Sequence, residues 1–217
     1  MSEAARLREE IAEAGHRMVS LGLTHGATGN ISARLSDGTA LITPTGVSLG
    51  RIDPAQICHL DASGGYLSGA KPTKELPLHQ AFYETRGART GAVVHLHSTH
   101  SVGLSVLPDV DPDDVLPPIT AYSVMQLGRV KLVPYYRPGD PEMGNAIRGL
   151  AGRRSAVLLA NHGPVIAGKD LMAACNAMEE LEATARLVFL TRGMQPRLLT
   201  GDQVTDLVRH FNVEWDA

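Results

Sequence analysis

Two segments with helical spacing enclose a run of short apolar segments, and this arrangement restricts the fold more than any other feature. Apolar residues recur every three or four positions from Leu7 to Leu21 and again from Leu171 to Val188, as on one face of a helix. Between them, three apolar runs have the length of strands: residues 91–97, 130–134 and 156–160. We therefore expect a single α/β domain over residues 1–217.

Local turn and capping signals add detail to this pattern. Ser36-Asp37-Gly38-Thr39 predicts the turn of a hairpin over residues 31–43, and residues 61–65 predict a second hairpin. Thr73 is a candidate N-cap for a helix over residues 74–85. In the last helix, Glu182 and Arg186 are four residues apart, which predicts a weak ion pair on its solvent side.

Composition excludes several classes of function. The 217 residues carry a net charge of −3, so we expect no general affinity for nucleic acid. The charged N-terminus and the lack of a long apolar run argue against a signal peptide and a membrane span. Cys58 and Cys175 are far apart and match no paired-ligand motif, which indicates free thiols in a reducing compartment. We expect a cytoplasmic protein.

Three histidines predict a metal centre. His95 and His97 are two residues apart in an apolar run, so on a strand they share a face. Such a pair alone is more often structural, but His162 directly follows the run at 156–160, and Gly163 allows a sharp turn there. Three imidazoles with one open position are a typical catalytic zinc site. His100 lies beyond the strand, where a supporting or packing role is expected.

Glu75 is the candidate acid–base residue. It falls in the first turn of the predicted helix at 74–85, where the helix dipole favours an anion. The alternative is that it only stabilises that helix terminus. His79 lies one turn further on, and packing in the core is its expected role.

Three segments of small residues form a candidate anion cradle, because turns and helix N-termini expose backbone N–H groups to phosphate. None matches a P-loop or a dinucleotide fingerprint, and each alone is compatible with ordinary turn chemistry. The segments are Thr28-Gly29-Asn30-Ile31-Ser32, Thr43-Pro44-Thr45-Gly46 and Pro72-Thr73-Lys74.

Taken together, these motifs resemble the class II aldolase/adducin family over about residues 10–195. The resemblance implies a three-layer α/β/α fold with a mainly antiparallel central sheet, and a homotetramer with active sites at subunit interfaces. The motifs that carry it occur in the family's order: Gly29-Asn30-Ile31-Ser32, Ile42-Thr43-Pro44-Thr45-Gly46, Glu75, His95-Leu96-His97 and Asn161-His162-Gly163.

The resemblance also implies roles for single residues. His95, His97 and His162 would hold Zn²⁺, or another divalent ion such as Mn²⁺ or Co²⁺. Glu75 would move protons and sometimes also bind the resting metal. Tyr122 would be a proton donor supplied by a neighbouring subunit. The implied phosphate contacts are Asn30, Thr45, Gly46 and Thr73.

Within the family, Lys74 distinguishes two candidate functions, an aldolase and a decarboxylase. Sugar-phosphate aldolases tend to carry two small hydroxyl residues before the catalytic Glu, whereas this chain has Thr73-Lys74-Glu75. That pattern, together with residues 95–100, 116–122 and 133–140, resembles the 3-oxo-tetronate 4-phosphate decarboxylases. The resemblance implies a phosphorylated sugar-acid substrate converted through an enediolate to dihydroxyacetone phosphate and carbon dioxide. Lys74 is then a candidate phosphate ligand. The alternatives are an aldolase of the fuculose-1-phosphate type, a related epimerase or dehydratase, and an interaction module resembling the adducin head.

Overall fold

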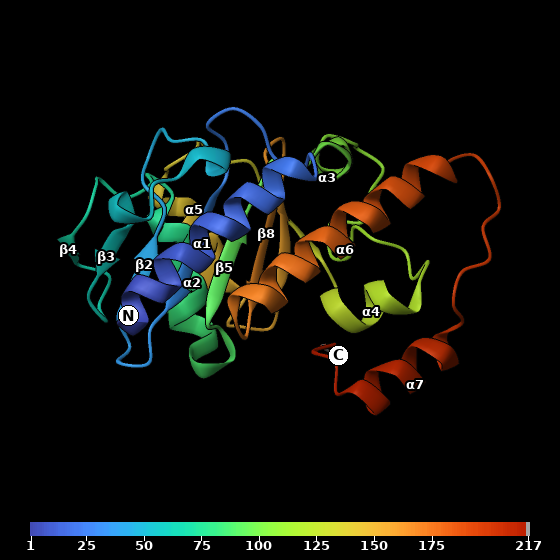
Figure 1. Ribbon diagram of the computed structural model, residues 1–217. Helices are drawn as coiled ribbons and strands as arrows, with labels where there is room; N and C mark the ends of the chain where they lie inside the picture. The colour runs from blue at the N-terminus through green and yellow to red at the C-terminus, as the bar shows by residue number, and fades with distance from the viewer. Residues whose placement is uncertain (216–217) are drawn as a thin grey trace.

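The computed structural model describes residues 1–215, and within them eight strands form one sheet (Figure 1). The strand order is β4-β3-β2-β1-β5-β8-β7-β6. Neighbouring strands are antiparallel except for β6 and β7, which are parallel. The strands are β1 (Asn30–Arg34), β2 (Ala40–Ile42), β3 (Cys58–Leu60), β4 (Tyr66–Ser68), β5 (Ala92–His95), β6 (Lys131–Val133), β7 (Ala156–Leu159) and β8 (Gly163–Gly168).

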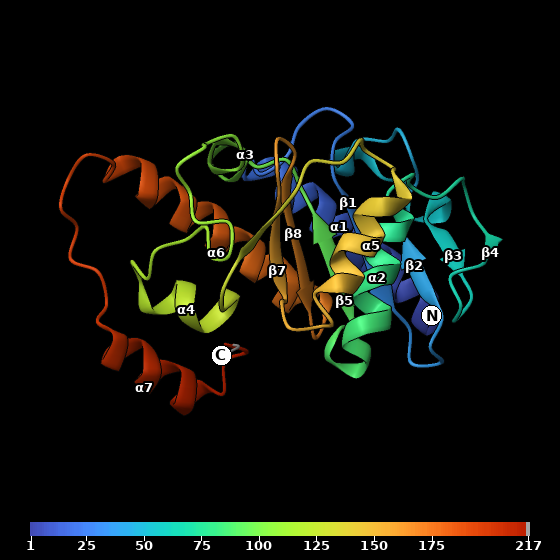
Figure 2. The same ribbon diagram turned by 180° about the vertical axis from the view of Figure 1, so that it is seen from behind.

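Helices cover both faces of this sheet, which confirms the expected three-layer α/β/α fold. In Figures 1 and 2, α1, α3 and α6 lie over one face, and α2 and α5 lie over the other. None of the helices in residues 1–215 combines the length and the apolar character of a membrane span. The helices are α1 (Glu3–Ser20), α2 (Leu76–Arg86), α3 (Thr99–Ser105), α4 (Ala121–Leu127), α5 (Pro141–Gly149), α6 (Leu171–Leu190) and α7 (Gly201–Phe211), with short 3-10 turns at Leu49–Arg51, Pro54–Gln56 and Gly87–Arg89.

Both predicted hairpins are present, because their turns are held by local side chains. Asp37 accepts hydrogen bonds from the backbone N–H and the hydroxyl of Thr39 in the β1–β2 turn. Asp61 accepts the N–H groups of Ser63 and Gly65 in the β3–β4 turn. Such side-chain bonds fix a turn without help from the rest of the fold.

The alternation of side chains along β5 determines the face of the sheet on which His95 lies. Val94 packs in the core beneath α1 and α6, whereas Val93 packs in the core beneath α2 and α5. Because successive side chains of a strand point to opposite faces, His95 lies on the face of Val93. The end of β5 therefore directs an imidazole towards the layer that contains α2.

The structure corrects the expectations for two glutamates. The predicted helix at 74–85 begins later, at Leu76, so Glu75 precedes the first helical residue, and its backbone N–H donates to the Thr73 hydroxyl. The predicted solvent-side pairing of Glu182 is wrong. Its carboxylate is buried and accepts hydrogen bonds from the backbone and side chains of His100 and Ser101 at the start of α3. A long-range contact thus overrides the i,i+4 pattern.

Both cysteines are buried free thiols, as predicted. Burial raises the pKa of Cys58 and that of Cys175 to about 11. Both thiols therefore stay protonated and unreactive near neutral pH.

Candidate active site

His95 is held in a single tautomer by the neighbouring strand. Its side chain is fully buried, and its Nδ1 lies 2.9 Å from the carbonyl oxygen of Pro164 on β8. A carbonyl can only accept, so Nδ1 carries the proton and Nε2 presents its lone pair. A hydrogen bond of this kind commonly orients a metal-binding histidine.

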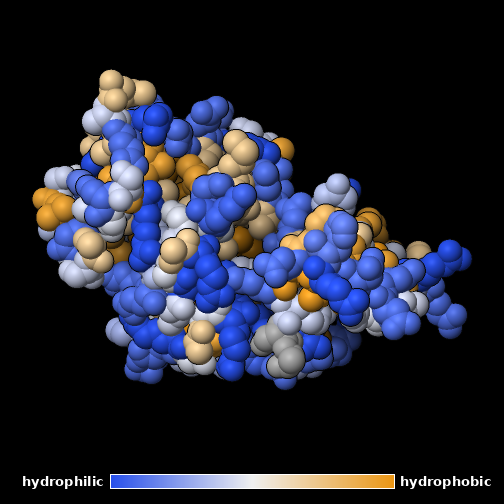
Figure 3. Space-filling view, turned by 90° about the horizontal axis from the view of Figure 1, so that it is seen from below, coloured by the Kyte–Doolittle hydropathy of each residue, from blue (hydrophilic) through white to orange (hydrophobic). Residues whose placement is uncertain are grey.

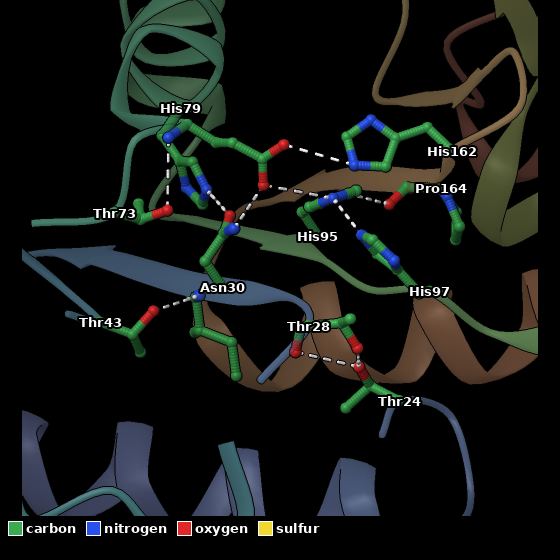
Figure 4. A network of polar contacts seen from close by, with 12 residues as sticks. Thr24, Thr28, Asn30, Thr43, Thr73, His79, His95, His97, His162 and Pro164 are labelled. Carbon is green, nitrogen blue, oxygen red and sulfur yellow. Dashed lines mark hydrogen bonds and ion pairs between the residues drawn. The ribbon is translucent and has the colours of Figure 1, made fainter. Parts of the chain in front are cut away.

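His97 and His162 bring their rings to the same point from two other segments (Figure 4). His97 lies just beyond β5, and its Nε2 is 3.2 Å from Nε2 of His95. His162 lies on the turn between β7 and β8. A Cβ on the next residue, Gly163, would lie 2.3 Å from the Leu96 carbonyl oxygen, so only glycine permits this approach. The predicted histidine set is therefore assembled.

Glu75 completes the cluster. Its carboxylate is 6% exposed, with Oε2 2.7 Å from Nδ2 of Asn30 and 3.5 Å from Nε2 of His95. Oε1 lies 3.3 Å from Nε2 of His162 and accepts no hydrogen bond. Burial would raise the pKa of Glu75, but His95, the bond from Asn30 and His162 hold it below its usual value. Neutral histidines no longer lower the pKa of Glu75, so the hydrogen bond from Asn30 is then the interaction that still lowers it.

The donor set fits a divalent metal ion. Burial, with repulsion from His95, lowers the pKa of His97 to about 3 and that of His162 to about 4. Both rings are therefore neutral at neutral pH, as metal ligands must be. One ligand atom from each of His95, His97 and His162 lies within 4.8 Å of the others. This spacing and the unpartnered Oε1 of Glu75 suit a three-histidine site of the catalytic kind.

A cavity of about 270 Å³ adjoins the cluster and is lined by residues from each of the three predicted cradle segments. Two of them are joined by an isolated bridge between Pro44 and Pro72. The cavity also reaches His97 and His162. The predicted contacts that line it are Asn30, Thr45, Gly46, Thr73 and Lys74.

A second groove, of about 530 Å³, also adjoins the cluster. It shares His97, His162 and Pro138 with the cradle cavity. His25 and Tyr135 also line it, and no role was predicted for either from the sequence. His25 belongs to a loop of small residues, and Tyr135 belongs to the segment 133–140 that resembles the decarboxylases. The cluster thus opens onto both spaces through His97 and His162.

Tyr122 is not part of this arrangement within one chain. It lies in the first turn of α4, is 62% exposed, and lines neither the cradle cavity nor the second groove.

Comparisons with known proteins agree with this geometry. The sequence profile described as "Class II Aldolase and Adducin N-terminal domain" matches residues 9–189. The chain is 46% identical over 201 residues to the 3-oxo-tetronate 4-phosphate decarboxylase of Escherichia coli K12, covering 93% of this chain and 94% of that protein. It is 32% identical over 212 residues to the L-fuculose phosphate aldolase of Haemophilus influenzae, covering 96% and 94%. A crystal structure of a putative aldolase/epimerase/decarboxylase from E. coli superposes with a TM-score of 0.92 at 44% identity, covering 95% and 99%.

Proposed function

Because the chain belongs to the class II aldolase and adducin family, we propose that it is a metal-dependent lyase that decarboxylates a 3-oxo-tetronate 4-phosphate. The products are dihydroxyacetone phosphate and carbon dioxide. One observation carries the proposal: two histidines of the cluster, His97 and His162, line both the cradle cavity and the second groove. A short acid with a phosphate at one end and a carboxylate at the other can therefore span the cluster.

The phosphate is assigned to the cradle. Backbone N–H groups around Gly29 and Gly46 and the hydroxyls of Thr45 and Thr73 are donors that suit its oxygens. Lys74 adds a positive charge at the rim. The Asn30 amide nitrogen has two hydrogens and gives one to Glu75, so the second is available for a phosphate.

Loss of carbon dioxide leaves an electron pair on carbon-2, and this pair must be delocalised onto the neighbouring ketone. A divalent ion, proposed as Zn²⁺ with Mn²⁺ or Co²⁺ as substitutes, supplies a Lewis acid for that oxygen when held by His95, His97 and His162. Carbon-2 must then receive a proton. The proton would come from water or from Tyr122 of a neighbouring copy: the ionised carboxylate of Glu75, with Oε1 3.3 Å from Nε2 of His162, would take it up and pass it to carbon-2.

An aldolase is the second candidate, since the chain is also 32% identical to an L-fuculose phosphate aldolase. Cleavage of a ketose 1-phosphate leaves the same electron pair beside the same ketone, so the cluster serves either reaction. The higher identity to the decarboxylase, together with Lys74 before Glu75, favours decarboxylation. A cluster of three histidines and Glu75 also argues against a purely structural, adducin-like role.

We also propose a homotetramer whose active sites are completed across an interface. The end of α6, the following connection and α7 project beyond the sheet, with apolar surface visible on this arm (Figures 1 and 3). Such surface is typical of association sites. Tyr122, exposed on α4, is available to the site of a neighbouring copy as a proton donor. The large exposed apolar residues of the arm are Leu187, Leu190, Met194, Leu198 and Phe211.

The test is incubation of the purified protein with a 3-oxo-tetronate 4-phosphate while carbon dioxide and dihydroxyacetone phosphate are both measured. Equal amounts of the two products, lost with a chelator and restored by Zn²⁺, would support the proposal. L-fuculose 1-phosphate is the comparison substrate. Release of an aldehyde from it, without decarboxylation of the acid, would establish the aldolase instead.

A further inference from the structure

A row of buried polar side chains runs from the candidate acid–base residue into the protein interior. Figure 4 shows two of its members, Asn30 and His79. Asn30 and Ser32 alternate along β1, so they share a face of the sheet. Glu75, His79 and Tyr83 are spaced four residues apart at and along α2, so they share a face of the helix. The two sets meet, and every member is less than 9% exposed.

Hydrogen bonds connect the whole row. Nδ2 of Asn30 lies 2.7 Å from Oε2 of Glu75, and Oδ1 of Asn30 lies 2.5 Å from Nε2 of His79. Oγ of Ser32 lies 2.7 Å from Nδ1 of His79 and 2.7 Å from the hydroxyl oxygen of Tyr83. Each internal member has two partners within the row, so the row is continuous from Glu75 to Tyr83.

The ionised carboxylate of Glu75 sets the direction of every bond. A carboxylate only accepts, so Asn30 must turn its NH₂ group towards Glu75 and its carbonyl towards His79. His79 therefore donates from Nε2, which leaves Nδ1 as the acceptor for the Ser32 hydroxyl. Ser32 then accepts from the Tyr83 hydroxyl. Rotating the Asn30 amide by half a turn would place oxygen against oxygen at Glu75 and N–H against N–H at His79.

We propose that His79, Ser32 and Tyr83 are positioning residues that lock the Asn30 amide with its N–H towards Glu75. This inference rests on the acid–base role proposed for Glu75. An amide does not pass protons readily, so the row orients the carboxylate and does not conduct protons from it. The row is buried and its members bond to one another, so the donor at Glu75 depends on groups that never touch the substrate.

Packing alone does not explain these residues. A leucine or phenylalanine at position 79 would fill core space without the cost of burying a polar ring. Instead, both ring nitrogens of His79 are paired, and the row ends at Tyr83, whose ring lies 4.3 Å beneath the Arg34 guanidinium. A polar row whose internal members Asn30, His79 and Ser32 each have two partners in the row specifies one arrangement of side chains.

Two substitutions at one position separate orientation from packing. His79→Leu removes the donor to Asn30, and kcat should fall by about 10- to 100-fold, the usual effect of losing such a supporting partner. KM should change little, because the cradle contacts remain, and bound metal should stay at the wild-type amount. His79→Gln should recover part of the loss, because a glutamine amide can place an N–H where Nε2 was.

The control is Ile147→Ala, which opens a cavity in the same apolar layer between α5 and α2. It should lower Tm while leaving kcat unchanged. A wild-type kcat in His79→Leu would contradict the proposal. So would a loss of kcat in His79→Leu that the Ile147→Ala control matches at the same fall in Tm.

A second measurement needs no substrate. ¹⁵N NMR of the metal-loaded wild-type protein should show the His79 ring neutral, with its proton on Nε2; a spectrum of His79→Gln assigns the signal. A proton on Nδ1 would overturn the proposal, because the Asn30 carbonyl would then face Glu75. If Nε2 is protonated but the wild-type enzyme does not decarboxylate, the proposed function fails and the positioning row stands.

Discussion

At the scale of single residues, His95 has the most restricted surroundings in the site. Its Nδ1 is bound to Pro164, so its Nε2 is available as a ligand. His95→Ala should bind far less metal and lose activity while keeping most of the fold, because a catalytic ion rarely holds a large domain together. Metal analysis of the purified variant measures this. His59→Ala, a histidine on β3 bonded to Thr39, is the matched control. Full metal occupancy in a His95→Ala, His97→Ala double variant would refute the assignment.

Glu75→Gln tests proton transfer separately from folding. The glutamine keeps the shape and an oxygen that can accept the Asn30 N–H, but it cannot act as a base. Loss of general acid–base catalysis typically lowers the rate by about 10²–10⁴-fold, and we expect kcat to fall within this range at unchanged Tm. A variant that turns over within about threefold of the parent would show that Glu75 has no such role.

Lys74→Ser tests the phosphate assignment. A charge-assisted hydrogen bond contributes about 1.5–3 kcal/mol, so its loss should raise KM by roughly 10- to 150-fold. kcat should stay nearly constant, because a phosphate contact acts equally on the ground and transition states. Lys71→Ser is the control, since Lys71 is exposed nearby but does not line the cradle cavity. A large fall in kcat at constant KM would instead identify Lys74 as a proton donor.

At the scale of elements, the carboxylate of Glu182 on α6 secures the start of α3. It accepts the backbone N–H groups of His100 and Ser101 at 2.8 Å each. Glu182→Leu should lower the free energy of unfolding by about 1–3 kcal/mol, because these N–H groups lose a buried acceptor. Urea unfolding measures the change. Arg186→Ala, at the exposed position that the sequence paired with Glu182, should have almost no effect. An equal loss of unfolding free energy in both variants would instead support the ion pair between Glu182 and Arg186 that the sequence predicted.

Local chemistry explains which elements the sequence predicted. Both hairpins follow from aspartates that bond within their own turns, and α1 and α6 follow from helical spacing. β8 (Gly163–Gly168) was not predicted because it contains a proline and two glycines, which are rare within strands. It forms a strand because it pairs with β5 and β7, and the local sequence does not indicate this pairing. The short helix α4 was missed for a similar reason, since its contacts are with α6 and α7.

In the candidate active site, the sequence predicted which residues take part but not how the fold places them. Residue types and spacing were enough to predict the three histidines and Glu75. They did not predict that β5 would end at His95, leaving His97 to reach the cluster from beyond the strand. Nor did they predict the bonds of His79, which the sequence reasoning assigned to packing, because its partners are 47 and 49 residues away in the chain. The second groove is likewise a product of folding.

At the scale of the whole molecule, buried neutral histidines couple stability to pH. Burial lowers the pKa of His79 to about 3 and that of His162 to about 4, whereas both titrate near 6.5 when unfolded. Between these values the unfolded chain binds more protons, so the metal-free protein should lose stability as pH falls below about 6.5. Urea unfolding with a chelator at about pH 7 and about pH 5 measures this. His162→Gln should reduce the dependence, and stability that rises on acidification would contradict it.

The placement of β5 between β1 and β8 has a consequence for how the protein is made. A ribosome releases His95 and His97 long before His162, and the strand that orients His95 through Pro164 comes later still. A growing chain therefore displays two imidazoles without the third, and it lacks the partner that fixes the tautomer of the first. If the three histidines bind the metal ion as proposed, the growing chain should not retain that ion firmly until β7 and β8 have been synthesised and β8 has paired with β5.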